Sequence, residues 1–206
     1  MSSCDKPFFL AILNQQYTPG NQSAHIARNW FSALVGGVNG HILDTSTMSK
    51  EVFVNTFSEV CKNHKILCLY VCVHGVQYRE KDGIKEFLKI NDRVEVPDYE
   101  FTALLNNLQF EQLYVFNESC HGAGLFNGIV LDKGETKLKN VVIFNACSKE
   151  EKCFVRIIYS QSIGLVSHLL FTSKINPFKS PETALSIVKH QYPGLQTTVT
   201  LLKNLN

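Results

Sequence analysis

The chain of 206 residues lacks any long apolar run, since its longest, Ile66–Val73, holds eight residues. A membrane-spanning helix needs about 20 apolar residues, so the sequence predicts no membrane partner. The polar opening Met1–Pro7 and the short apolar run Phe8–Leu13 do not make a secretion signal. We therefore expect a soluble, intracellular protein of the cytoplasm.

The chain also has little net charge and no paired cysteines of the zinc-binding kind. A net charge of +2 and the absence of a basic stripe with interleaved aromatic residues predict no nucleic-acid partner. The seven cysteines are unevenly spaced and form no CxxC pair, which disfavours zinc and fits a reducing compartment. The phosphate-binding patterns GxGxxG and GxxxxGK[ST] are missing, so a nucleotide- or flavin-binding module has no motif to support it.

What is present is the pattern of one globular domain in which strands and helices alternate. Hydrophobic residues make up 45% of the chain and charged residues 18%, as in ordinary globular proteins. Buried strands followed by helices predict an α/β sandwich with a mainly parallel central sheet. Strands are expected at residues 8–13, 40–44, 66–73, 112–117 and 141–145, helices at 24–35, 49–62, 97–107, 162–171 and 181–190, and a hairpin at 77–90 that turns at Asp82-Gly83.

Reactive side chains follow two of the expected strands. His74-Gly75 comes directly after the strand Ile66–Val73, and Cys120 comes soon after the strand Gln112–Asn117. Ligands of open parallel sheets bind beyond the carboxyl ends of the strands. If these two strands are neighbours, His74 and Cys120 meet at one edge of the sheet.

Such a meeting would suit nucleophilic catalysis. A thiol becomes a strong nucleophile when an imidazole accepts its proton, and the same imidazole can later protonate a leaving amine. The backbone N–H groups of Gly75 and Cys120 are candidate donors to the oxyanion of a tetrahedral intermediate. We read Cys120 as the nucleophile and His74 as its base, while the neighbouring His121 is read as part of the loop structure.

At these residues the sequence resembles the caspase/metacaspase superfamily, and metacaspases most closely. Residues Glu118-Ser119-Cys120-His121-Gly122-Ala123-Gly124 are similar to the metacaspase signature Asp-Ser-Cys-His-Ser-Gly, and His74-Gly75 matches the His-Gly of the preceding strand. The resemblance implies a caspase-like three-layer α/β/α sandwich and a cysteine endopeptidase that acts on protein or peptide substrates. It also implies a large-subunit-like part at about 1–125, a small-subunit-like part at about 140–206 and a linker between them.

The resemblance also suggests how substrates are chosen. Glu118 holds the position of a metacaspase aspartate that binds a basic side chain at P1, the residue before the cleaved bond, so Arg or Lys is expected there. Ser23 stands where the family has a second acidic residue, and Ser148 follows the strand 141–145; both are assigned to substrate binding. No resident cofactor or metal is expected. A calcium requirement stays open, since Asp82, Glu86, Asp92, Glu95 and Asp98 are scattered around the hairpin.

A second interpretation of the same resemblance is a catalytically inactive regulatory or scaffolding module. Ser23 and Gly122 depart from the metacaspase pattern, which favours this alternative, whereas the retained Cys120 and His74 favour the peptidase. The oligomeric state is left open by the sequence.

Overall fold

A six-stranded sheet forms the centre of the protein, which is described by a computed structural model. The structure describes residues 6–16, 21–81, 83–108, 110–121, 124–126, 129, 138–148, 155–158 and 161–203. The strand order is β11-β8-β7-β3-β1-β2, and only β11 runs antiparallel to its neighbour. The strands are β1 (Phe8–Leu13), β2 (Asn39–Asp44), β3 (Ile66–Cys72), β7 (Gln112–Asn117), β8 (Asn140–Asn145) and β11 (Thr198–Lys203).

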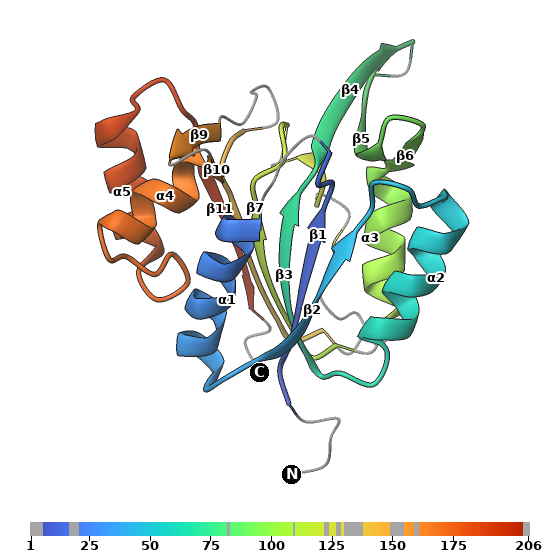
Figure 1. Cartoon of the computed structure of the whole chain (residues 1–206), viewed down its shortest axis with the longest axis horizontal. Helices are drawn as coiled ribbons and strands as arrows, with labels where there is room; N and C mark the ends of the chain where they lie inside the picture. Colours follow the sequence, from blue (N-terminus) through green and yellow to red (C-terminus); the bar gives the residue numbers. More distant parts are fainter. Residues whose placement is uncertain are drawn as a thin grey trace.

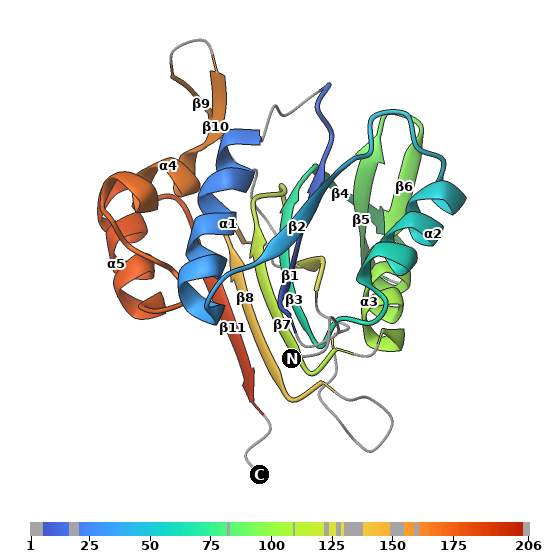
Figure 2. The same cartoon turned by 60° about the horizontal axis from the view of Figure 1, so that its bottom comes forward.

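Helices cover both faces of this sheet and make three layers (Figures 1 and 2). One face carries α1 (Asn21–Val35), α4 (Leu165–Thr172) and α5 (Pro181–Gln191). The opposite face carries α2 (Lys50–Cys61) and α3 (Asp98–Asn107). This is the α/β/α sandwich with a mainly parallel sheet that the alternation of elements predicts.

Two hydrophobic cores result from the alternation of side chains along the strands. Leu10 and Ile12 of β1 belong to one core together with Phe53 of α2. Phe9 and Ala11 of the same strand belong to the other core, between the sheet and α1. Because successive side chains of a strand point to opposite faces, a central strand covered on both sides must be apolar throughout. This explains the unbroken apolar runs of β1 and β3.

A second, three-stranded antiparallel sheet continues from the carboxyl end of β3. It consists of β4 (His74–Glu80), β5 (Gly83–Asn91) and β6 (Val94–Pro97). Only Val73 separates the end of β3 from the start of β4. In Figure 1, β4 and β5 project beyond the end of the central sheet. The hairpin expected at 77–90 is confirmed, with strands that extend further than the sequence indicates. The turn was expected at Asp82-Gly83, which is wrong for Gly83, because this residue begins β5 and pairs with Glu80.

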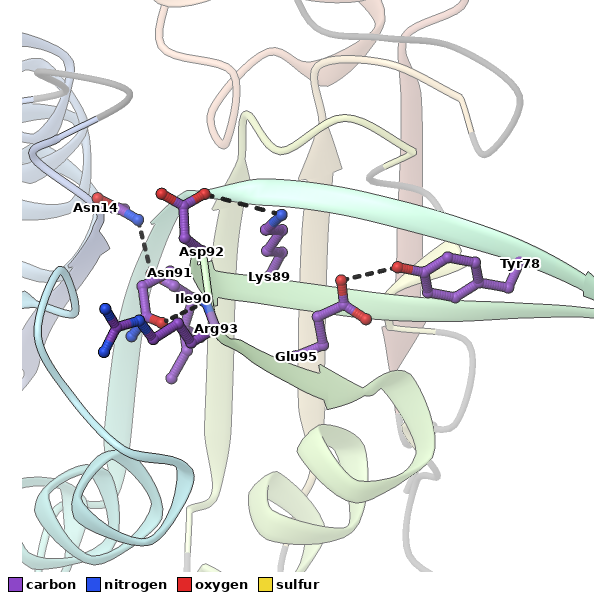
Figure 3. Close-up of polar contacts among 8 residues, drawn as sticks. All are labelled: Asn14, Tyr78, Lys89, Ile90, Asn91, Asp92, Arg93 and Glu95. Carbon is purple, nitrogen blue, oxygen red and sulfur yellow. Dashed lines mark hydrogen bonds and ion pairs between the residues drawn. The ribbon is translucent and has the colours of Figure 1, made fainter.

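Buried hydrogen bonds fix the base of this small sheet to the central one (Figure 3). The backbone carbonyl of Ile90 accepts from the Asn14 amide at 3.0 Å and from the Thr45 hydroxyl at 2.5 Å. The amide of Asn91 donates to the backbone carbonyls of Thr45 and Met48, at 2.9 and 2.7 Å. Since a broken buried hydrogen bond leaves an unsatisfied polar group, these contacts hold β5 in place relative to β1 and β2.

The C-terminal part differs from the prediction in two places. The helix expected at 162–171 begins only at Leu165, because Gln161–Gly164 is a strand, β10, that pairs with β9 (Val155–Ile158). The strand β11 was not predicted, although its three β-branched residues Thr198, Val199 and Thr200 are typical of a strand. Most of the expected linker after Leu125 lies outside the described residues. Among the helices that the structure describes, none is long and apolar enough to cross a membrane.

Candidate active site

The carboxyl ends of β3 and β7 bring the expected catalytic residues to one place. The two strands are parallel neighbours, with Val71 opposite Asn117. Beyond the strands the chains remain side by side, because the Glu118 N–H donates to the Val71 carbonyl at 2.8 Å and the Val73 N–H donates to the Ser119 hydroxyl at 3.4 Å. The neighbouring strands on which the meeting of His74 and Cys120 depends are therefore present.

A tight turn presents Cys120 at the end of β7. The Asn117 side chain accepts from the Ser119 N–H at 3.0 Å and donates to the Asn145 side chain at 3.1 Å. His121, directly after Cys120, adopts a left-handed backbone with φ of 53°. The buried Asn117 thus fixes the turn that leads to Cys120.

Gly75 packs directly on the backbone of Cys120. A β-carbon at position 75 would overlap the Cys120 carbonyl oxygen, so glycine is required for this close approach. The contact shows that the start of β4 and the turn after β7 lie against each other. It also brings the backbone of Gly75, one of the two expected oxyanion donors, beside Cys120.

His74 and Cys120 line one pocket of about 630 Å³. The first half of β4 forms one wall of this pocket, and the turn after β7 forms another. Because a single pocket reaches both the thiol and the imidazole, one bound molecule can contact both. Its full lining is His74, Gly75, Val76, Gln77, Tyr78, Lys89, Cys120 and His121.

The environment of His74 favours the neutral imidazole. Burial lowers the pKa of His74 from its ordinary value, and the positive charge of Lys89 lowers it further. A neutral imidazole is the form that accepts a proton. At neutral pH His74 is therefore in the protonation state that a general base requires.

Glu118 lies in a buried polar site between Tyr70 of the sheet and Ser167 of α4. Its side chain is buried, with 6% exposed, and accepts from the Tyr70 hydroxyl at 2.8 Å, the Ser167 N–H at 2.9 Å and the Ser167 hydroxyl at 2.5 Å. Burial raises the pKa of Glu118, whereas hydrogen bonds from Ser167, Tyr70 and Ser23 oppose the rise. The Ser23 hydroxyl also accepts from the Gly164 N–H at 2.9 Å.

Ser23 and Glu118, which the sequence predicts to belong to one site, lie together in the structure. Neither Ser23 nor Glu118 is among the residues that line the Cys120 pocket. Gly164 packs so closely on the Glu118 carboxylate that a β-carbon there would overlap it. A side chain from outside would reach Glu118 only after Gly164 and Ser167 move.

Four further cysteines are buried and differ in setting from the half-buried Cys120. Burial raises the pKa of the Cys61 and Cys68 thiols far above the ordinary value, so both stay protonated. Cys147 donates from its thiol to the Ser119 carbonyl at 3.3 Å, and Cys72 lies in the core of the α1 face. Buried free cysteines of this kind act as small apolar residues.

The carboxylates considered for calcium have separate partners. Glu86 accepts from the Gln77 amide, Asp92 lies 4.0 Å from the Lys89 ammonium, and Glu95 accepts from the Tyr78 hydroxyl (Figure 3 shows the last two). Within the described ranges, no three His, Cys, Asp or Glu side chains gather as a metal site would require. Asp82 lies outside these ranges, and we assign no calcium site.

Several residues around the pocket were not predicted. His121 was read as loop structure, but it lines the pocket with Cys120. Lys89 is paired with His74 in the β4–β5 ladder. Counting back along the hairpin from the pair of Glu80 and Gly83 would have predicted this pairing. Tyr70 and Ser167 carry no sequence signal of their contact with Glu118. Ser148 is buried at the end of β8, and its role in substrate binding remains a prediction.

Comparison with known proteins gives one kind of match. No protein-family model and no curated protein sequence matches the chain. Among solved structures, the chain is similar to the crystal structure of caspase-1 from Spodoptera frugiperda, with 12% sequence identity, a TM-score of 0.48, and coverage of 97% of this chain and 87% of that one. At this identity the likeness says nothing about individual side chains.

Proposed function

We propose that the chain is a cysteine endopeptidase that hydrolyses peptide bonds through an acyl-thioester on Cys120. The observation that supports the proposal is the shared pocket, which is lined by the half-buried Cys120 and by His74, whose pKa is lowered, at the ends of adjacent strands. A nucleophile and a base within reach of one bound molecule are what acyl transfer requires.

In the first half of the reaction, His74 takes the proton from the Cys120 thiol. The sulfur then attacks the carbonyl carbon of the peptide bond, and the oxygen of the tetrahedral intermediate becomes negative. Backbone N–H groups of Gly75 and Cys120 are the proposed donors to this oxygen. The carbon–nitrogen bond breaks as the His74 imidazolium returns its proton to the leaving amine, which leaves an acyl-thioester on Cys120.

In the second half, water replaces the amine. His74 takes a proton from the water molecule, the resulting hydroxide attacks the thioester carbonyl, and the sulfur departs. The proton held by His74 restores the Cys120 thiol. No further side chain is needed for the proton balance, so the roles of other pocket residues lie in positioning and selecting the substrate.

Alkylation tests this proposal directly. We expect iodoacetamide to abolish cleavage of a fluorogenic peptide panel that varies P1, in step with modification of Cys120. Cys61 and Cys68 should react slowly, because only the thiolate is nucleophilic and burial keeps them protonated. Mass mapping of tryptic peptides identifies the modified cysteine. Cleavage that survives complete modification of Cys120 would contradict the proposal.

For specificity we propose a basic P1 residue that pairs with Glu118. A carboxylate that is removed from water and surrounded by donors binds a cation more strongly than one on the surface. Guanidinium or ammonium N–H groups would take over the contacts now made by the Tyr70 and Ser167 hydroxyls. Since Glu118 is closed off in the unliganded protein, binding of such a substrate requires Gly164 and Ser167 to shift.

Glu118→Gln tests this specificity. We expect kcat/KM for Arg or Lys at P1 to fall about tenfold or more relative to Leu or Gln at P1, because the charge-assisted contact is lost. The matched control is Glu86→Gln, another buried glutamate with 6% exposed, which should leave the ratio of basic to neutral P1 unchanged. An equal loss for every P1 residue in Glu118→Gln would mean that Glu118 only holds the start of α4.

The closed site around Glu118 favours a second candidate, the catalytically inactive regulatory module. Three hydrogen bonds already satisfy this carboxylate within the protein, as in a structural polar cluster. This candidate predicts no turnover of any peptide in the panel, with calcium or with chelator, and an ordinary, slow reaction of Cys120 with iodoacetamide.

A further inference from the structure

The chemistry proposed for His74 determines which side of the pocket receives which part of the substrate. The imidazole that protonates the leaving amine must lie beside that amine, so residues after the cleaved bond extend along the His74 side. Glu118, proposed for P1, contacts Ser167 of α4 and does not line the pocket of His74. The wall formed by β4 and β5 therefore faces the leaving part of the substrate. This step rests on the proposed function.

Lys89 is the cation of this wall. It is paired directly with His74 in the antiparallel ladder, and directly paired residues project from the same face of a sheet. Of the described residues that line the pocket, Lys89 alone carries a permanent charge. Glu95, its direct partner in the β5–β6 ladder, accepts from the Tyr78 hydroxyl. The Lys89 side chain is 27% exposed, and it lies 4.0 Å from the Asp92 carboxylate, which is 66% exposed. A loose surface pair of this kind contributes little, so the ammonium is open to another anion.

Hydrogen bonds hold the chain next to Lys89 in place. The next residue, Ile90, has its carbonyl held by Asn14 and Thr45, and Asn91 is held by two backbone carbonyls. Figure 3 shows Lys89 extending from this anchored segment toward Asp92. A charge fixed beside a reaction site selects among ligands more sharply than one on a mobile loop.

From these contacts we infer that Lys89 binds a carboxylate in the first or second residue after the cleaved bond. The carboxylate can belong to an Asp or Glu side chain or to the free C-terminus of a short substrate. Either would sit against the Lys89 ammonium, on the face of the small sheet that Lys89 shares with His74. The substrate class is thus a peptide with negative charge on its leaving side.

The test compares peptides that differ only in this charge. Internally quenched peptides carry Glu or Gln at the first or second position after the bond, and a second pair ends there with a free or an amidated terminus. At about pH 8, where an ordinary imidazole is neutral, we expect the wild type to cleave the charged member about fivefold faster in kcat/KM. In Lys89→Gln this ratio should fall to about one, and in Lys89→Glu it should invert. Asp92→Asn, the matched control, should keep or increase the preference.

Using ratios separates substrate selection from any effect of Lys89 on His74, since such an effect changes both peptides equally. A wild-type ratio of one, or a ratio that Lys89→Gln does not change, would overturn the inference while leaving the peptidase proposal intact. If no peptide is cleaved, the proposed function fails. Fluorescence anisotropy of the same peptides with wild type and Lys89→Gln then tests the carboxylate site by binding alone. Tighter binding of the charged peptide that depends on Lys89 supports the carboxylate site; its absence refutes it.

Discussion

Cys120→Ala should lower kcat/KM by at least about 10⁴-fold, because no other group in the pocket can form the acyl-thioester. The thermal unfolding temperature should change little, since Cys120 lies in a turn, is half-buried, and does not pack in either hydrophobic core. Activity on the best peptide of the panel and a melting curve of the same preparation give both quantities. A folded variant with undiminished activity would remove Cys120 from the mechanism.

The matched control for this variant is Cys61→Ala. Cys61 is buried at the last position of α2, in the core between the sheet and helices α2 and α3, and it does not line the pocket. Loss of its sulfur should cost about 1 kcal/mol of stability through the small cavity that remains, with activity retained. The two cysteine variants should thus show opposite patterns, one losing activity with stability kept and the other the reverse.

His74→Ala should lower kcat/KM by about 10²–10⁴-fold and also change its dependence on pH. In the wild type the base must be neutral, so activity rises with pH and levels off above the pKa of His74. That pKa is lowered by burial and by Lys89, so the midpoint of the acidic limb should lie below the ordinary histidine value of 6.5. In His74→Ala this acidic limb should disappear.

The profile of kcat/KM between about pH 5 and 8 measures this effect. Lys89→Gln supplies a graded control, since removing the nearby positive charge takes away one of the two causes that lower the His74 pKa. The acidic limb should then move to higher pH while remaining present. An acidic limb that persists unchanged in His74→Ala would show that another group titrates, and His74 would lose its role as base.

The positions of the expected catalytic residues could be predicted because they depend on local signals. Continuous apolar runs mark β3 and β7 as central parallel strands, and a His-Gly and a Cys follow directly at their carboxyl ends. Parallel strands align these ends, so the sequence alone predicts that His74 and Cys120 lie near each other. Gly75 follows from the same reasoning, since a close backbone approach needs a residue without a side chain.

The surroundings of the site were less predictable because they depend on contacts between distant segments. Glu118 could be recognised as a candidate from its neighbours in sequence, but its burial results from Tyr70 on β3 and Ser167 on α4. A further difference is local: Ser162–Gly164 was expected to begin a helix, but these residues pair with β9, which ends three positions before β10 begins, and are therefore extended.

The anchoring of β5 has a consequence for how motion is distributed over the small sheet. Its base is tied by buried hydrogen bonds of Asn14, Thr45 and Asn91, whereas the residues toward its tip, Tyr78–Lys81 and Gly83–Lys85, are exposed. Amide hydrogens near Ile90 should therefore exchange with solvent only through large-scale opening, and those near the tip through small local fluctuations. A peptide lying along this sheet would meet an unyielding surface next to Cys120 and an adaptable one further out.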